Sequence, residues 1–461
     1  MGKLVHDKNC GCESMKIGLE IHVQLPTKTK MFCSCPAVGA SGPNERICPG
    51  CMGMPGTRPS LNKAAVEIGI KLARLLNCSI PDVMWFNRKI YFYPDLCRHY
   101  QITQYETPVG LSGEYYLGKK RIGITRAHLE EDPGSMEKSG DGSLIDYNRS
   151  GMPLVEIVTD PDMASPAEAR EFLTSLLKDI RHVIDLPSDG ERSIRVDCNI
   201  SVGTERCEVK NVTGLKNVER ALTYEAVRQT KVLRSGGKIV RETRHYDEER
   251  KVTTAARKKE YAGDYAYIGE PNLGSINLKK IADGIRTKES PLSMAMRLRK
   301  EFGIDEKIAK QIVNTSMKLA ELFEHFALKA GKDNALKWVS GPISSNWKAL
   351  EKDADTKKDA LTEILVRFAN GKINDVECSM LLKACITGED LVNTEKRGAD
   401  LDALIREAIA DNPSVVDDHR KNEKAGNRII GAVMKETGGM YSSSDIVEAT
   451  KKILDEMTCS R

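Results

Sequence analysis

The sequence has no long apolar run. None of its hydrophobic segments approaches the roughly 18 residues that a membrane span needs, and residues 1–15 lack the apolar centre of a signal peptide. Aromatic residues make up only 5% of the 461 residues, and although 30% are charged, the net charge is only +4. No excess of positive charge demands a polyanionic partner, so any nucleic-acid surface must be local. We expect a soluble, cytoplasmic protein of two or three domains.

Two familiar phosphate-binding loops are also missing. The sequence contains no G-x4-G-K-[ST] segment and no G-x-G-x2-G segment that opens a helix. It also lacks a Ser-His-Asp or Cys-His order that would indicate a covalent nucleophile. If the protein uses a nucleotide, basic residues and a metal ion on a sheet must hold it.

Cysteine is plentiful, at 13 residues, and this odd number argues for reduced thiols and against a disulfide framework. A C-x-C pair and a C-x2-C pair bracket a loop rich in Gly, Pro and Asn, at Cys33, Cys35, Cys48 and Cys51. This spacing can place four thiolates around zinc, and a site filled by four sulfurs is closed and therefore structural. Four unrelated buried thiols are the alternative. Cys10 and Cys12 precede the first predicted strand, and we regard them as incidental.

Residues 126–157 concentrate acids, a histidine and an arginine. At their start, Arg126, His128 and Glu130 alternate as in a strand and share one face, and Glu131 follows on the other face. Such a polar face is either a charged site or a solvated edge with incidental charges. The strand alone leaves both interpretations open.

Two further segments supply partners for a charged site. Residues 16–24 place Glu20 and His22 on one strand face, and residues 153–159 are almost wholly apolar except for Glu156. A buried carboxylate is unfavourable unless it is paired or coordinates a cation. Carboxylates and imidazoles on neighbouring strands suit Mg²⁺ or Mn²⁺.

A fourth predicted strand, residues 193–202, places Arg195, Asp197 and Asn199 on one face, and a polar segment follows at residues 208–211. Asp197 joins the candidate metal ligands. Within residues 87–95, Arg88 and Lys89 immediately precede an aromatic stretch that we predict to be a strand. Basic residues beside aromatic ones suit a phosphate site, but an aromatic strand with charged ends explains them as well. The phosphate and ATP candidates are Arg88, Lys89, Arg149, Arg195 and Lys210.

Helical patterns accompany the strands and then replace them. Residues 60–77 predict a core helix capped by Ser60 or Asn62, and a capping box at Ser165 opens another helix. From about residue 290 helical periodicity dominates. Helices are predicted there at 305–323, 357–370, 374–384, 401–410, 422–436, which Gly438 and Gly439 end, and 444–457. We predict three domains: a catalytic domain at 1–290 with a zinc knuckle at 33–51, a helical linker domain at 291–411 and a helical tail at 412–461.

Several long motifs resemble one family. They are GLEIHVQLPTKTKMFCSC from Gly18, CPGCMGMPGTRPSLN from Cys48, RKIYFYPDL from Arg88, YQITQ from Tyr100, RAHLEEDPG from Arg126, DYNRSGMPLVEIV from Asp146 and SIRVDCNISV from Ser193, followed by EVKN. Over nearly the whole chain the sequence resembles the B subunit of tRNA-dependent amidotransferases, the GatB family. The related E subunit carries an inserted domain for which this length leaves no room.

The chain departs from the family pattern in three places. Residues 263–272 read GDYAYIGEPN where DDYRYFPEPD is usual, which puts the role of that arginine and phenylalanine in doubt. Pro133 stands where alanine is common. Cys97, Arg98 and His99 stand where Pro-Lys-Gly is usual, and we expect neither this change nor the one at Pro133 to touch a metal ligand.

The resemblance implies a fold and an activity. The fold is α+β, with a glutamine-synthetase-like cradle built on a curved, largely antiparallel sheet, then an all-α domain and a small helical tail that grip tRNA. The activity is that of a ligase that forms a carbon–nitrogen bond with glutamine as amide donor. ATP and Mg²⁺ serve to phosphorylate the side-chain carboxylate of Asp-tRNA(Asn) or Glu-tRNA(Gln), and ammonia then displaces phosphate. The implied partners are the glutaminase A subunit and the C subunit of a heterotrimer, and misacylated tRNA, with no membrane.

For this chemistry we assign catalytic roles to Glu20, His22, Glu131 and Glu156. The magnesium set adds Glu130 and Asp197, and structural Zn²⁺ takes the four cysteines. Basic residues of the tail are candidates for phosphate contacts, or ordinary solvated helix faces: Lys421, Lys424, Arg428 and Lys435. The alternative function is a non-catalytic, zinc-bearing tRNA-binding subunit of an RNA-modifying complex. A pure polyanion binder would not place so many acids on its central strands, which favours the enzyme.

Overall fold

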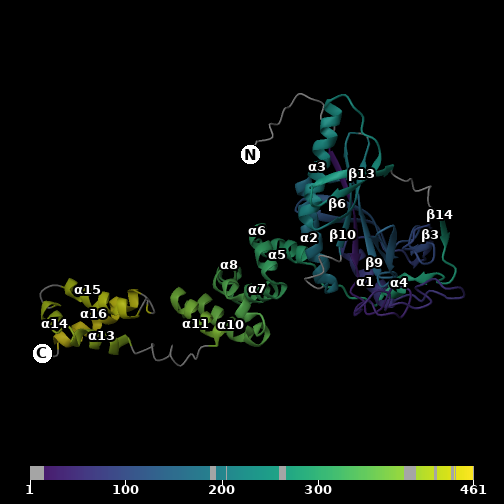
Figure 1. Cartoon of the computed structure of the whole chain (residues 1–461). Coiled ribbons are helices and arrows are strands. Elements are labelled where there is room, and N and C mark those ends of the chain that lie inside the picture. The colour runs from purple at the N-terminus through teal and green to yellow at the C-terminus, as the bar shows by residue number, and fades with distance from the viewer. Residues whose placement is uncertain are drawn as a thin grey trace. The chain divides into compact units, whose positions relative to one another are not determined.

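The computed structural model describes residues 15–186, 194–203, 205–258, 266–388, 401–419, 423–437, 441 and 443–459 (Figure 1). Two compact units divide the chain, Met1–Ser290 and Pro291–Arg461. Cys10, Cys12, Gly438, Gly439 and Lys421 lie outside the described residues. No helix in the described parts of the chain is both long and apolar enough to cross a membrane.

An eight-stranded sheet is the framework of the first unit, in the order β13-β12-β11-β10-β1-β9-β6-β5. Neighbouring strands run antiparallel, apart from the parallel pair β11 and β12, so the predicted, largely antiparallel sheet is confirmed. The strands are β1 Met15–Gln24, β5 Gly110–Leu117, β6 Lys120–Glu131, β9 Pro153–Thr159, β10 Ile194–Val202, β11 Cys207–Thr213, β12 Glu242–Asp247 and β13 Val252–Lys258.

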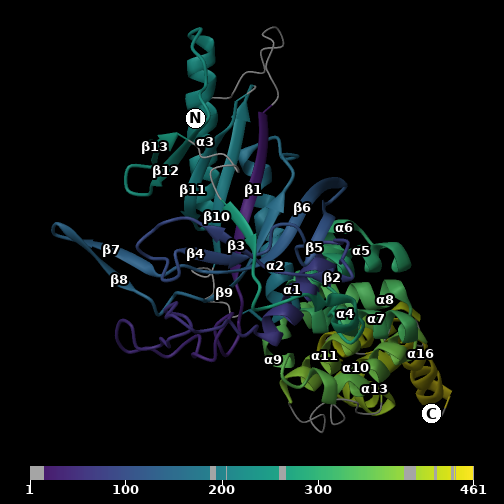
Figure 2. The ribbon, with the colours of Figure 1, turned by 90° about the vertical axis from the view of Figure 1, so that its right-hand side faces the viewer.

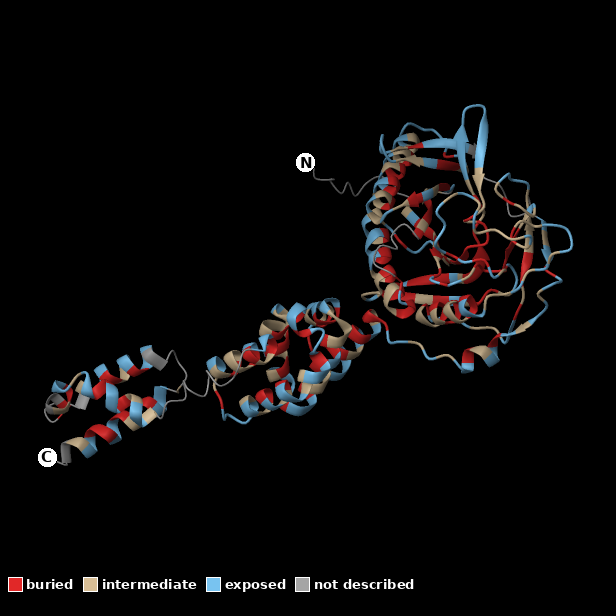
Figure 3. Ribbon diagram, turned by 60° about the horizontal axis from the view of Figure 1, so that its bottom comes forward, coloured by how far each residue is buried: buried red, intermediate tan, exposed pale blue. Residues whose placement is uncertain are grey.

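Three helices pack against one face of this sheet: α1 Lys63–Leu75, α2 Pro166–Ile184 and α3 Leu215–Arg234. Their buried sides form the core with alternate strand residues such as Leu19, Ile21 and Val23, which are at most 1% exposed (Figure 3). The α1 cap is Asn62, whose side chain accepts from Ala65 N, and Ser165 caps α2 as predicted. The opposite face is left for polar side chains.

A smaller sheet, β14-β3-β4, joins β3 Asn87–Ile90, β4 Tyr100–Thr103 and β14 Ala266–Gly269. The predicted aromatic strand at 87–95 is wrong beyond Ile90, because the chain turns there, with Leu96 N donating to Tyr93 O, and Phe92 is 80% exposed. Shorter elements of this unit are the hairpin β7 Ser135–Ser139 and β8 Gly142–Asp146, which projects in Figure 2, the pair β2 Val83–Met84 and β15 Ile276–Asn277, and α4 Leu278–Asp283.

The described part of the second unit is helical. Its first hydrophobic cluster, from Met294 to Ile386, lies among α5 Pro291–Phe302, α6 Glu306–Thr315, α7 Met317–Ala330, α8 Lys332–Trp338, η3 Val339–Ile343, α9 Trp347–Leu350, α10 Ala354–Ala369 and α11 Asp375–Thr387. The single helix predicted at 305–323 is two helices. Ser316 interrupts it with an extended backbone, and its side chain accepts from Lys318 N to cap α7.

A second cluster, from Ile405 to Leu454, lies among α13 Leu401–Ala410, α14 Ser414–His419, η4 Glu423–Gly426, α15 Asn427–Thr437 and α16 Ser443–Cys459. Because α13 packs on α15 and α16, it belongs with the tail helices that follow it. Arg428 and Lys435 are exposed on α15.

Candidate functional site

The register of the central strands aligns four polar side chains in one row across the sheet. His128 on β6 pairs with Glu156 on β9, which pairs with His22 on β1, which pairs with Arg195 on β10. Because alternate strand residues point to opposite faces, all four side chains lie on the face away from α1, α2 and α3. We call this the site face.

Glu130, two residues beyond His128 on the same face of β6, joins Glu156 and the two imidazoles of this row. His22 Nε2 lies 3.3 Å from Glu156 Oε2 and 3.6 Å from Glu130 Oε1. His128 Nε2 lies 3.4 Å from Glu156 Oε2 and 3.6 Å from Glu130 Oε2. Burial opposes the charge on His22, but hydrogen bonding to Glu156 and the nearby carboxylates raise its pKa to about 10. The carboxylates around His22 thus stabilise positive charge at this point of the sheet.

Glu131 lies on the other face of β6, away from this row. Arg98 Nη1 donates to Glu131 Oε1 at 2.7 Å, and Ile102 N donates to the same oxygen at 3.1 Å. Burial raises the pKa of Glu131 above its usual value, and Arg98 opposes that rise. The expectation that the change at Cys97, Arg98 and His99 touches no candidate ligand is wrong, because Arg98 folds back onto Glu131. Sequence spacing alone could not show this contact.

A second acidic cluster lies beside the row. Glu20 pairs with Asp197 across β1 and β10, and Glu208 joins them, with ligand atoms within 4.8 Å of one another. Lys210 Nζ lies 3.1 Å from Asp197 Oδ2 and 3.2 Å from Glu208 Oε1. Burial, followed by the charge of Glu156, raises the pKa of Glu20.

A β-bulge brings the second cluster together. Val196 pairs with Val212 and Cys198 with Val209, so two residues of β11, Lys210 and Asn211, oppose Asp197. Asn211 adopts a left-handed backbone, with φ 55°, and its N–H donates to Asp197 Oδ1 at 2.7 Å. The extra residue thus gives Asp197 two donors from one strand.

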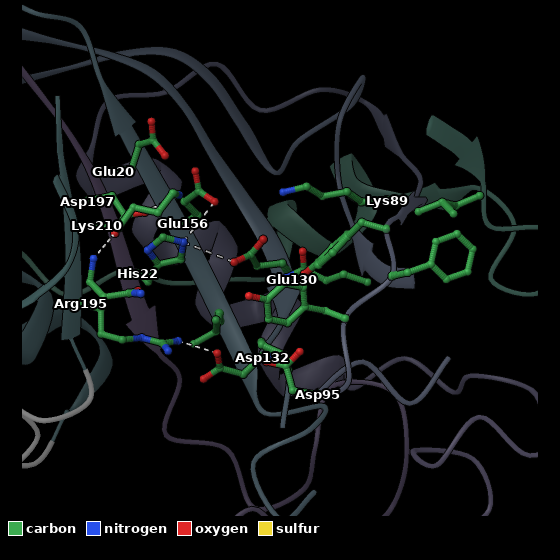
Figure 4. Close-up of a pocket in the computed structure, with 18 of the residues that line it drawn as sticks. Glu20, His22, Lys89, Asp95, Glu130, Asp132, Glu156, Arg195, Asp197 and Lys210 are labelled. Carbon is green, nitrogen blue, oxygen red and sulfur yellow. Dashed lines mark hydrogen bonds and ion pairs between the residues drawn. The ribbon is translucent and has the colours of Figure 1, made fainter. Parts of the chain in front are cut away.

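Both clusters line a cavity of about 760 Å³ (Figure 4). Lys89 extends toward the carboxylates from the wall opposite His22. Arg195, which lies beside His22 on the sheet, pairs with Asp132. Ala266 also lines this cavity, in the segment that departs from the family pattern. The predicted residues that the cavity brings together are Glu20, His22, Lys89, Glu130, Glu156, Arg195, Asp197 and Lys210.

Arg88 and Arg149 are not among the described residues that line this cavity. Arg88 makes two hydrogen bonds to buried Glu270, at 2.7 and 3.0 Å. Arg149 donates to the backbone carbonyls of Pro133 and Gly134, at 3.0 and 2.8 Å. Both guanidinium groups therefore hold parts of the chain that surround the site.

A second cavity, of about 440 Å³, continues along the site face beyond Glu20. Three cationic residues line it, Lys16, Arg206 and Arg241, and Glu20 lines both cavities. This carboxylate therefore stands between a wall with cations on one side and the row of imidazoles on the other.

The four cysteines of residues 33–51, which we call the knuckle, bring their sulfurs within 4.8 Å of one another. Cys48 N–H points to Cys51 Sγ at 3.1 Å, and buried Lys30 places its Nζ 3.9 Å from the same sulfur. A hydrogen bond from Cys33 lowers the pKa of Cys51 to about 4, with help from Cys48 N–H and Lys30 and against the effect of burial. Four converging sulfurs with the cationic Lys30 beside them fit zinc.

The sequence places His128 and Glu208 in polar segments, but both are missing from the candidate site residues predicted from it. The signal was present, because His128 stands two residues before Glu130 and Glu208 two residues before Lys210, on the same strand faces. Their importance depends on which strands are neighbours, and the sequence does not state the strand order.

Buried acids and imidazoles around a cavity on a central sheet indicate a protein with a catalytic domain. Residues 15–282 match the family model described as the GatB/GatE catalytic domain, and residues 321–454 match the one described as the GatB domain. The chain therefore belongs to the GatB family.

Proteins named as the B subunit of aspartyl/glutamyl-tRNA(Asn/Gln) amidotransferase resemble the chain over almost its full length. The one from Methanospirillum hungatei JF-1 is 38% identical over 470 residues, covering 95% of this chain and 98% of that protein. The one from Thermoanaerobacter pseudethanolicus is 39% identical over 471 residues, with the same coverage of both chains. The one from Methanococcoides burtonii is 39% identical over 453 residues, covering 93% of this chain and 95% of that protein.

Proposed function

We propose that this chain is the component of a glutamine-dependent amidotransferase that activates the amino acid on misacylated tRNA. ATP phosphorylates the side-chain carboxylate of Asp-tRNA(Asn) or Glu-tRNA(Gln), and ammonia released by a glutaminase A subunit replaces phosphate to give the amide. The observation that carries the proposal is the pair of acidic clusters on one sheet face, in a chain whose relatives are named as the B subunit of this amidotransferase.

The first chemical step joins two anions. A carboxylate oxygen of the substrate attacks the γ-phosphorus, ADP leaves, and an acyl phosphate forms. His22, Glu130 and Glu156 would hold one Mg²⁺, and Glu20 and Asp197 would hold another together with Glu208. Bound Mg²⁺ supplies positive charge that offsets the repulsion between carboxylate and phosphate.

Cationic side chains divide the remaining work. Lys89, Arg195 and Lys210 line the larger cavity, where they would bind phosphoryl oxygens and exclude water. Each is already beside a carboxylate or faces one, so its charge is oriented before substrate arrives. In the second step ammonia attacks the acyl carbon, phosphate leaves, and the nitrogen loses a proton.

The two cavities suggest separate approaches for the two substrates. The smaller one, with Lys16, Arg206 and Arg241 at its wall, suits the polyphosphate of ATP. The larger one, with Lys89 opposite the imidazoles, suits the aminoacyl end of tRNA. Glu20 lies at the boundary, where the γ-phosphate and the carboxylate must meet.

Other assignments follow from the same proposal. Glu131, which pairs with Arg98, takes a structural role in place of the catalytic role that the sequence predicts, and Arg88 and Arg149 hold the surrounding chain. The four cysteines hold a structural Zn²⁺. The curved sheet would form a glutamine-synthetase-like cradle in a domain ending near residue 290. The helical domain and tail would contact tRNA, with the C subunit as further partner in the cytoplasm.

An assay of the purified complex tests this function. With ATP, glutamine and each misacylated tRNA in turn, we expect ADP release and formation of Asn-tRNA or Gln-tRNA that both require aminoacylated tRNA. Binding of misacylated tRNA without ATP consumption or amide formation would favour the non-catalytic tRNA-binding alternative.

A further inference from the structure

One arginine joins the knuckle to the end of strand β6. Arg98 Nε donates to Gly50 O at 3.3 Å, between the second pair of cysteines, and Arg98 Nη1 donates to Glu131 Oε1 at 2.7 Å. The side chains of Arg98 and Glu131 are 10% and 6% exposed, so water screens this ion pair little.

The knuckle fits closely around the arginine. Gly53 has φ +67°, and a Cβ atom there would lie 2.6 Å from Arg98 Cγ and 3.1 Å from Arg98 Cα. Only glycine allows both this backbone and this approach. The folded knuckle thus fixes the position of Arg98 from one side while Glu131 holds it from the other.

The end of β6 is held through the same residue. Glu131 O accepts from Gln101 Nε2 at 2.7 Å, and Glu131 Oε1 accepts from Ile102 N as well as from Arg98. Glu130 precedes it on the site face and reaches His22 at 3.6 Å. Because the two glutamates share a peptide unit, a shift of Glu131 would move Glu130 relative to His22.

The pair is also expensive to break. Glu131 Oε2 is buried and has no hydrogen-bond partner within the described parts of the chain, and Arg98 is the cation that compensates this carboxylate. A buried carboxylate that loses its cation is strongly destabilised, and the strand end would rearrange to reach water.

We propose that Arg98 is a positioning residue that couples the knuckle to the cation site of His22, Glu130 and Glu156. When four sulfurs hold the knuckle folded, Arg98 holds Glu131, and Glu130 stays aimed at His22. Loss of the knuckle would release Arg98 from Glu131, which lies 33 residues further along the chain, and would weaken divalent-cation binding at the neighbouring Glu130. The inference rests on the proposed function only in taking these three residues as cation ligands.

Binding of Mn²⁺ to the purified complex without nucleotide, followed by the electron paramagnetic resonance of free Mn²⁺, tests the coupling. Arg98→Met should weaken binding about tenfold, the lower end of the loss seen when residues behind metal ligands are changed. Arg98→Lys, which keeps the charge, should restore part of it. Gly53→Ala, which displaces Arg98 without changing a charge, should weaken binding as well.

The matched control is Arg121→Met, which removes an exposed arginine paired with Glu114 at 2.7 Å near the start of the same strand. It should leave Mn²⁺ binding unchanged. Zinc content, measured on every variant, should match the wild type for Arg98→Met, which separates a broken link from a collapsed knuckle. If Arg98→Met does not fold, Arg98→Lys and Gly53→Ala still decide the question.

A double-mutant cycle gives the sharpest result. Gly53→Ala alone should weaken Mn²⁺ binding, and combined with Arg98→Met it should weaken binding no further than Arg98→Met alone, because both changes break one link. Additive effects, or normal Mn²⁺ binding by Arg98→Met, would overturn the coupling alone. Failure of the wild-type complex to bind Mn²⁺ would overturn the coupling together with the proposed cation site.

Discussion

The two units of the chain differ in what they bury. The first unit buries carboxylates, an imidazole, a lysine and an arginine, among them Glu130, Asp197, His128, Lys30 and Arg244. From Pro291 onward, the described residues that are both buried and of a polar or charged type are only His419 and Thr450. Burying charge costs free energy unless every charge finds a partner. The first unit bears that cost on its central strands, where its buried charges lie in pairs, whereas the described part of the second unit buries few polar residues.

Loss of cysteines from the knuckle should give the largest effect, because we propose that zinc binding holds this part of the first unit folded. Cys48→Ser with Cys51→Ser should remove about one zinc per chain and the solubility of the protein, since zinc binding contributes directly to folding. Metal analysis and the soluble yield measure both. Cys385→Ser, in the second unit, should change neither. A soluble, fully active, zinc-free double variant would show that the cysteines are ordinary core residues.

The next largest effect should come from the charged row of the sheet. Glu156→Gln keeps the size of the side chain but removes the charge that meets both imidazoles, so ATP-dependent amidation should fall by about 10² or more. Binding of tRNA should stay nearly intact. Rates of amide formation measure the loss, with Glu137→Gln on the exposed β7 hairpin as control. An active Glu156→Gln enzyme would make these acids structural and erase the contrast between the units.

The second unit should affect substrate binding and not the chemical step. Ending the chain at Gly388 removes α13 together with the helices it packs on, whereas a cut at 412 would expose Ile405 and Ile409. The KM for tRNA should rise by about tenfold or more, while glutamine hydrolysis in the complex survives. Steady-state kinetics at varied tRNA concentration measure this. An unchanged KM would move tRNA recognition to the first unit.

The smallest effect should come from the loss of a helix cap, which should lower the free energy of unfolding equally in the two units. Ser165→Ala and Ser316→Ala each remove one helix cap, of α2 and α7, and each should lower the free energy of unfolding by about 1 kcal/mol. Urea denaturation of the two variants measures it, and amidation rates should not change. A much larger loss at either position would mean that the cap also supports contacts beyond its own helix.

Local structure could be predicted from the sequence more fully than the site. Strand alternation correctly separated the faces of Glu130 and Glu131, because that depends only on neighbouring residues. It could not say which face meets His22, since β1 lies between β9 and β10, strands that follow it by more than a hundred residues. Arg88 looked like a phosphate ligand because its partner, Glu270, stands 182 residues away.

The bulge opposite Asp197 interrupts the regular pairing of β10 with β11. Removing one residue, Lys210 or Asn211, would let β10 and β11 pair without interruption. No residue would then need the left-handed backbone that Asn211 has. The repaired ladder would leave Asp197 with one opposing residue in place of two. A design procedure that rewards regular strands would therefore make a tidier sheet and discard the geometry that gathers the second acidic cluster.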